Sequence, residues 1–145
     1  MYDFLNSRVL FASHPDDEDA ALLKLGPYFS DADTAQNMLT LAEVKLLLSR
    51  IEDNGRYPDN PVYNKTKEYV NTFSRFEGAE MAAAARTTVP QGEGEFEYFE
   101  QVQLINLCPM EAEEAKALIP SIKMDDDRLQ EYLNTLTLQR KSQVA

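Results

Sequence analysis

The fold is decided by the stretch Phe99-Glu-Gln-Val-Gln-Leu-Ile-Asn-Leu-Cys-Pro-Met-Glu-Ala-Glu-Glu-Ala-Lys-Ala-Leu-Ile-Pro-Ser121, in which two short helices and both of their ends can be read. The first helix is expected to end at Cys108, because a residue that precedes proline is pushed out of the α region. The second carries glutamates in its first turn, where they favour the positive end of the helix dipole, and Pro120 closes it. The apolar spacing puts Phe99, Val102, Ile105 and Asn106 on one stripe of the first helix, and Ala112, Ala115, Leu118 and Ile119 on one face of the second. Such a pair is typical of an interaction module rather than of an enzyme.

Two more helices are predicted upstream of this stretch. Thr40 and Glu43 fit a capping box, and apolar residues then recur at helical spacing until Asp53-Asn54-Gly55 ends the run. After a proline-containing loop, a second helix is expected from about Val62 to Phe76. Its spacing predicts that the inward residues are Tyr69, Val70, Phe73 and Phe76.

The chain should then continue as an alanine-rich helix over Glu77–Arg86 that packs against the aromatic helix. Gly78 inside it is expected to weaken the helix by about 1 kcal/mol relative to alanine. Residues 87–94 indicate a mobile connector rather than a phosphate-binding loop, because no Lys-Ser or Lys-Thr pair follows their glycines. The run Asp125-Asp126-Asp127 lacks the alternation and the final glutamate of a calcium loop, so it should cap a last helix bearing Leu129, Tyr132, Leu133 and Leu136.

The predicted fold is therefore all-α. An extended N-terminal arm over residues 1–38 should precede a helical domain over residues 39–145, with about six short to medium helices in all. In the arm, Gly26-Pro27 breaks any helix between an apolar group and two aromatic residues. That patch needs cover, either from the chain's own helices or from a partner.

Four blocks in order along residues 16–141 resemble one known family. They are Asp17-Glu18-Asp19-Ala20 with Leu25-Gly26-Pro27 and Phe29, then Leu41-Ala-Glu43-Val44, then Tyr69 with Phe73-Ser74-Arg75-Phe76, and the quoted Phe99–Ser121 stretch. Together they resemble the fourth-largest subunit of eukaryotic RNA polymerase II, more than the equivalent subunits of other nuclear polymerases. The resemblance implies a C-terminal half like the HRDC module of certain helicases and ribonucleases. Relatives commonly have threonine at the position of Glu111, so the helix there should start more weakly unless Glu111 itself caps it.

The resemblance also implies a function. The chain would be a non-catalytic subunit that joins the seventh subunit and the polymerase core, forming a stalk near the RNA exit that supports initiation and meets factors that follow the transcript. RNA would be held mainly by the partner, and the location would be the nucleus, with shuttling to the cytoplasm as a further expectation. The implied partner-binding residues are Leu22, Leu23, Leu25, Tyr28 and Phe29 in the arm, with Leu41, Phe99, Gln103, Leu104, Leu107, Leu118 and Ile119 in the domain. Some of the latter must instead fill the domain's own core.

Composition narrows the classes of function. The formal net charge is −11, from 14 basic and 25 acidic residues, and no basic run is longer than Arg140-Lys141. This acidic balance argues against direct binding of nucleic acid. It favours either a basic protein partner or an acidic surface that serves solubility alone. A single cysteine excludes an intrachain disulfide, and no apolar run is long enough for a membrane span, so a soluble intracellular protein is expected.

One motif points to a different class of protein. His14-Pro-Asp-Asp-Glu18 resembles the zinc signature of the N-acetylglucosaminyl-phosphatidylinositol deacetylase family, in which His14 and Asp17 would bind zinc and Asp16 would act as base. That family supplies a third ligand as a downstream histidine, and this chain has no second histidine. A turn ahead of the acidic block is the preferred interpretation.

No catalytic residue, metal site or cofactor is expected. Cys108 should be a small buried side chain, because the only histidine that could activate it lies far away in the sequence. The rival to a polymerase subunit is a free-standing helical adaptor, which would have similar amphipathic helices but would be stable as a monomer without a partner.

Overall fold

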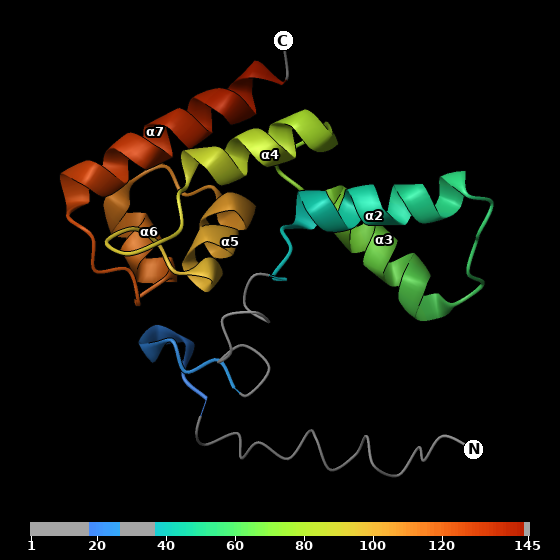
Figure 1. The fold of residues 1–145 in the computed structure, drawn as a ribbon, viewed down its shortest axis with the longest axis horizontal. Helices are drawn as coiled ribbons and strands as arrows, with labels where there is room; N and C mark the ends of the chain where they lie inside the picture. The colour runs from blue at the N-terminus through green and yellow to red at the C-terminus, as the bar shows by residue number, and fades with distance from the viewer. Residues whose placement is uncertain (1–17, 27–36, 144–145) are drawn as a thin grey trace.

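The computed structural model describes residues 18–26 and 37–143, and this part of the chain is all-helical (Figure 1). It has one 3-10 turn and six α-helices, with two isolated β-bridges and no longer strand in the described residues, so the all-α prediction is confirmed. The elements are η2 (Ala20–Leu22), α2 (Leu41–Asp53), α3 (Pro61–Phe73), α4 (Gly78–Thr88), α5 (Tyr98–Leu107), α6 (Ala112–Leu118) and α7 (Asp126–Ser142). None of the described helices is long and apolar enough to cross a membrane.

Helix α4 joins two parts of the molecule. On one side α4 packs against α2, which forms a hairpin with α3. On the other side α4 packs against α5 and α7, and α6 packs against α7. Figure 1 shows α4 and α7 side by side above α5 and α6, the α2–α3 hairpin extending to one side, and η2 at the opposite end from the end of α7. The core lies mainly in the larger part, and its largest fully buried apolar side chains are Phe76, Phe96, Leu104, Ile105, Leu129, Leu133 and Leu136.

Helix α3 is covered on one side only. Val70 and Phe76 are buried as predicted, but Tyr69 is 54% exposed and Phe73 is 47% exposed, so the inward placement of these two rings was wrong. The reason is that α3 packs mainly on α2, whereas the spacing argument assumed a neighbour that covers the whole aromatic stripe. The two rings instead contact each other, with centroids 4.7 Å apart.

The predicted continuation of the aromatic helix into the alanine-rich helix was also wrong. Residues 74–77 are not helical, and the Ser74 hydroxyl donates a hydrogen bond to the Phe76 carbonyl across this break. Gly78 stands at the first position of α4 with φ +78°, in the left-handed region that favours glycine, rather than inside a helix. The break turns the chain so that α4 packs against α2, α5 and α7.

Most predicted helix ends are confirmed. Thr40 and Glu43 form the capping box of α2, Asp125 caps α7 through the Asp127 amide, and α5 ends at Cys108 in a left-handed conformation with φ 49°. Glu111 makes no side-chain cap on α6. The start of α6 is instead capped by Gln130 of α7, whose side-chain oxygen accepts a hydrogen bond from the Ala112 amide at 2.9 Å.

The connector between α4 and α5 is fastened to the domain. Gln91 and Phe96 form a β-bridge, and the Phe96 ring is buried, 5.4 Å from the ring of Tyr132. The Glu95 carboxylate pairs with Arg128 and accepts a hydrogen bond from the Tyr132 hydroxyl at 2.8 Å. The connector therefore contributes to the core, which its glycines and proline did not indicate.

Candidate partner-binding surface

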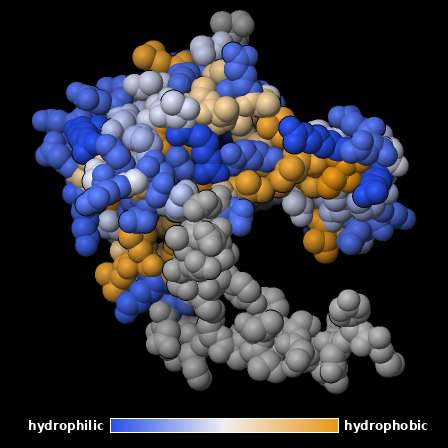
Figure 2. Space-filling model, viewed as in Figure 1, coloured by the Kyte–Doolittle hydropathy of each residue, from blue (hydrophilic) through white to orange (hydrophobic). Residues whose placement is uncertain are grey.

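The described part of the arm forms a closed turn that presents leucines. Asp19 and Lys24 exchange two backbone hydrogen bonds of 2.9 Å, and the Asp19 side chain accepts from the Ala21 amide. Leu22 at the tip is 65% exposed, whereas Leu23 and Leu25 are half-buried. Figure 2 shows apolar surface at this turn. Tyr28 and Phe29 lie outside the described residues.

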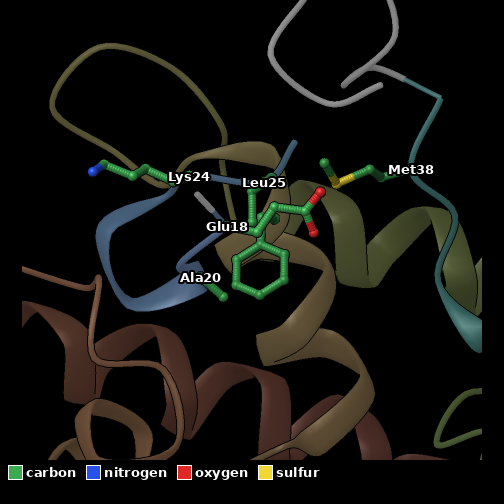
Figure 3. A pocket seen from close by; sticks show the side chains of 6 residues that line it. Glu18, Ala20, Lys24, Leu25 and Met38 are labelled. Atoms are coloured by element: carbon green, nitrogen blue, oxygen red, sulfur yellow. The ribbon is translucent and has the colours of Figure 1, made fainter. Parts of the chain in front are cut away.

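The arm turn, the segment before α2 and α5 border two pockets that share lining residues. A pocket of about 370 Å³ is lined by Leu25, Met38 and Phe99, together with the arm's Glu18, Ala20 and Lys24. Figure 3 shows the side chain of Met38 pointing from the segment before α2 toward Glu18 and Leu25. The next pocket shares Met38 and Phe99, and its other lining residues are Asn37, Leu39, Val44, Val102, Gln103 and Asn106. We call the two together the α5 groove.

The stripe of α5 seen in the sequence explains this groove. Phe99, Val102 and Asn106 share one helix face and line the groove, as does Gln103, whereas Ile105 is buried in the core. The sequence argument did not select Met38, Leu39, Val44 and Val102 as partner-binding residues. Val44 and Val102 were visible as members of amphipathic stripes, but nothing local indicated that Met38 and Leu39 would lie against α5.

Arg86 of α4 holds the groove wall in place. Its guanidinium donates to both carboxylate oxygens of Glu43, at 2.9 and 2.7 Å, and to the Gln101 side-chain oxygen at 2.6 Å. It also donates to the Met38 backbone carbonyl at 2.6 Å. One side chain thus joins α2, α4 and α5 to the segment that carries Met38.

The Glu43 carboxylate is kept ionised by these contacts. Its partial burial raises the pKa, but hydrogen bonds from Arg86 and from the Thr40 backbone amide and hydroxyl, with the charge of Arg86, outweigh burial and leave the pKa below its usual value. The folded state therefore binds this proton less readily than the unfolded chain does.

This shift predicts a pH dependence of stability. A carboxyl whose pKa is lowered on folding stabilises the protein above its unfolded pKa, and that contribution is lost as pH falls through the folded value. The free energy of unfolding of wild type should exceed that of Glu43→Gln at pH 6, and the difference should shrink steadily toward pH 3. Urea denaturation across this range measures it. A difference that does not change with pH would contradict this role of Glu43.

Other predicted partner residues are sorted by burial. Leu104 and Ile119 are fully buried in the domain's core, so they do not belong to the exposed surface of this chain. Leu41 is half-buried at the start of α2, where its amide donates to the Asn106 side-chain oxygen at 2.9 Å. Leu107 and Leu118 are exposed at the ends of α5 and α6 and do not line the α5 groove.

The described residues contain no cluster of metal-ligand side chains, and their one cysteine is buried. No group of three or more His, Cys, Asp or Glu side chains within them could hold a metal ion, and His14, Asp16 and Asp17 lie outside them. Cys108 is buried, and burial raises the pKa of its thiol to about 11 although Arg140 and Arg75 oppose this. The expectation of a buried cysteine is confirmed, and its raised pKa disfavours the reactive thiolate.

Comparison with known proteins gives consistent matches. The family described as RNA polymerase Rpb4 matches residues 38–140. The chain is 42% identical over 135 residues to DNA-directed RNA polymerase II subunit rpb4 of Schizosaccharomyces pombe, which covers 88% of this chain and 95% of that protein. It is 31% identical over 141 residues to DNA-directed RNA polymerase II subunit 4 of Arabidopsis thaliana, covering 89% and 98%. A Dictyostelium discoideum rpb4 subunit is 41% identical over 80 residues, covering 54% and 50%.

Proposed function

This chain belongs to the Rpb4 family of RNA polymerase II subunits, and we propose that it pairs with the polymerase's seventh subunit to form a stalk beside the RNA exit. It is a non-catalytic subunit with a nuclear location. Its role in the stalk is to support initiation by holding the clamp closed and to present a surface to factors that follow the transcript.

The α5 groove is the observation that carries this proposal. It runs from Leu25 of the arm turn across α5 to Val44 of α2, and its walls are mostly apolar. An exposed apolar groove of this extent, rimmed by polar side chains, marks a protein interface. The seventh subunit lies in this groove, and the arm closes over it.

The charge of the chain fits a partner that holds the RNA. With a net charge of −11, the chain as a whole disfavours binding to a phosphate backbone. RNA contact by the stalk therefore belongs mainly to the seventh subunit. The surface of this chain outside the α5 groove contacts the polymerase core and factors that follow the transcript.

Co-expression with the seventh subunit tests the pairing. The chain and its partner should elute as a 1:1 complex by size exclusion with light scattering. Val102→Asp places a carboxylate in the groove, and the double variant Leu22→Asp/Leu25→Asp places one in the groove and one on the exposed tip of the arm turn, where an apolar partner surface would desolvate them. Each is expected to weaken binding at least a hundredfold.

Val62→Asp is the matched control. Val62 is 71% exposed on α3 and lines neither pocket of the groove, so the same kind of change should leave the complex intact. Circular dichroism and thermal melting establish that each variant is folded. If the chain stays a well-folded monomer in the presence of the seventh subunit, the stalk proposal is wrong and the free-standing adaptor is the better interpretation.

A further inference from the structure

The half of the α5 groove that lies between α2 and α5 has uncharged walls. It is the pocket of about 470 Å³ that contains Val44, Val102 and Gln103, and none of its described lining residues is Lys, Arg, Asp or Glu. The neighbouring charges of Arg86 and Glu43 are already bonded to each other. A partner group that carried a charge into this pocket would therefore lose its water without gaining a counter-ion. The polar side chains in the described lining are all amides.

The side-chain amide of Asn106 has a fixed direction in this pocket. Its oxygen accepts the hydrogen bond from the Leu41 amide at 2.9 Å, so its nitrogen points away from the start of α2. That nitrogen donates to no other residue in the part of the chain that the structure describes. Because an amide nitrogen can donate but cannot accept, Asn106 selects a partner group that accepts a hydrogen bond.

Gln103 supplies a second amide on the same side of α5. It lies one turn before Asn106, lines the same pocket and is half-buried. Its side chain forms no hydrogen bond with any described residue. Water can satisfy this amide while the groove is open, but an occupant that displaces the water must replace those bonds or bind more weakly. The occupant must therefore bring uncharged hydrogen-bonding groups to both amides.

An extended main chain meets these requirements. Its N–H and C=O groups are unpaired along its edge, and every second side chain points to the same face, where it can enter the apolar part of the pocket. A helix offers no such groups along its length, because its main-chain groups bond to one another. We propose that an extended segment of the seventh subunit lies along α5 and that its peptide groups bond to Asn106 and Gln103. This inference rests on the pairing proposed above, and it makes the two amides the specificity-determining residues of the groove.

Replacing Gln103 by methionine separates hydrogen bonding from apolar packing, because methionine has nearly the same length and no amide. The affinity of the full chain for the seventh subunit is measured by isothermal titration calorimetry. Gln103→Met should weaken binding at least tenfold, since a peptide group of the segment would be buried without its partner. Gln91→Met makes the same change at an exposed position outside the groove and should leave the affinity unchanged.

Replacing Asn106 by aspartate tests whether the segment presents an acceptor. Aspartate keeps the oxygen that bonds to the Leu41 amide, so the start of α2 stays capped, but it puts a second oxygen in place of the donor. Because this oxygen would face a main-chain carbonyl, we expect the affinity to fall at least a hundredfold. Asn64→Asp, at an exposed position of α3, should bind like wild type.

A crystal structure of the 1:1 complex tests the same contacts directly. We expect a main-chain carbonyl oxygen of the seventh subunit about 3 Å from the Asn106 side-chain nitrogen. A helix lying on α5, or a Gln103→Met variant that binds as tightly as wild type, would overturn the extended segment and leave the pairing intact. If the wild-type chain does not bind the seventh subunit at all, the pairing itself is wrong and the extended segment falls with it.

Discussion

Replacing Arg86 by methionine should lower the free energy of unfolding by about 3 kcal/mol, because the hydrogen-bonded carboxylate of Glu43 would lose its cation while remaining partly buried. The Gln101 side-chain oxygen and the Met38 carbonyl would lose their donor as well. Methionine keeps most of the side-chain volume, so the loss reports the polar contacts rather than a cavity. Urea denaturation of the full chain at pH 7 measures it.

Lys45→Met is the matched control for this substitution. Lys45 also pairs with a glutamate, Glu77, but that carboxylate is 63% exposed. An exposed ion pair contributes under about 1 kcal/mol, so Lys45→Met should have a small effect. Equal losses in the two variants would contradict the special role of the Arg86 contacts.

Replacing Phe96 by alanine should cost about 4 kcal/mol of unfolding free energy, which is the usual range for a fully buried aromatic side chain. The ring packs edge to face against Tyr132 and belongs to the main core, although it lies in a connector. Total stability of a domain is about 5–15 kcal/mol, so this variant should be close to unfolding at physiological temperature. Thermal melting and urea denaturation would show it.

Phe73→Ala supplies the comparison. Phe73 is nearly half exposed on α3, and its main ring contact is with Tyr69. Its loss should cost about 1 kcal/mol. If Phe73→Ala were as damaging as Phe96→Ala, then α3 would be part of the main core and the structure's placement of its aromatic face would be wrong.

The helix ends were the most predictable part of the fold, because each depends on a few neighbouring residues. Thr40 with Glu43, Cys108 before Pro109, and Asp125 all act where the sequence places them. Glu111 shows the limit of local reasoning. The helix that follows Glu111 is capped by Gln130, which lies 19 positions later in the sequence and reaches the helix start only because α6 packs on α7.

Burial was less predictable, because spacing says which residues share a face and not what covers that face. Tyr69 and Phe73 share one face of α3, as the spacing predicts, but no helix of the described chain covers that face fully. Leu104 and Ile119 fill the core, whereas Phe99 and Gln103 from the same candidate set line the α5 groove. Arg86 was not recognised from the sequence at all, since its partners lie on three other segments.

Hydrogen exchange of the chain, alone and with the seventh subunit, tests the central claim most directly. The account predicts that complex formation slows exchange in the arm turn over residues 19–25, in the segment from Asn37 into the first turn of α2, and on α5. Amides of the α3 face that carries Tyr69 and Phe73 should exchange at the same rate in both states. Protection confined to α3, or no change along the arm turn and α5, would contradict pairing through the α5 groove.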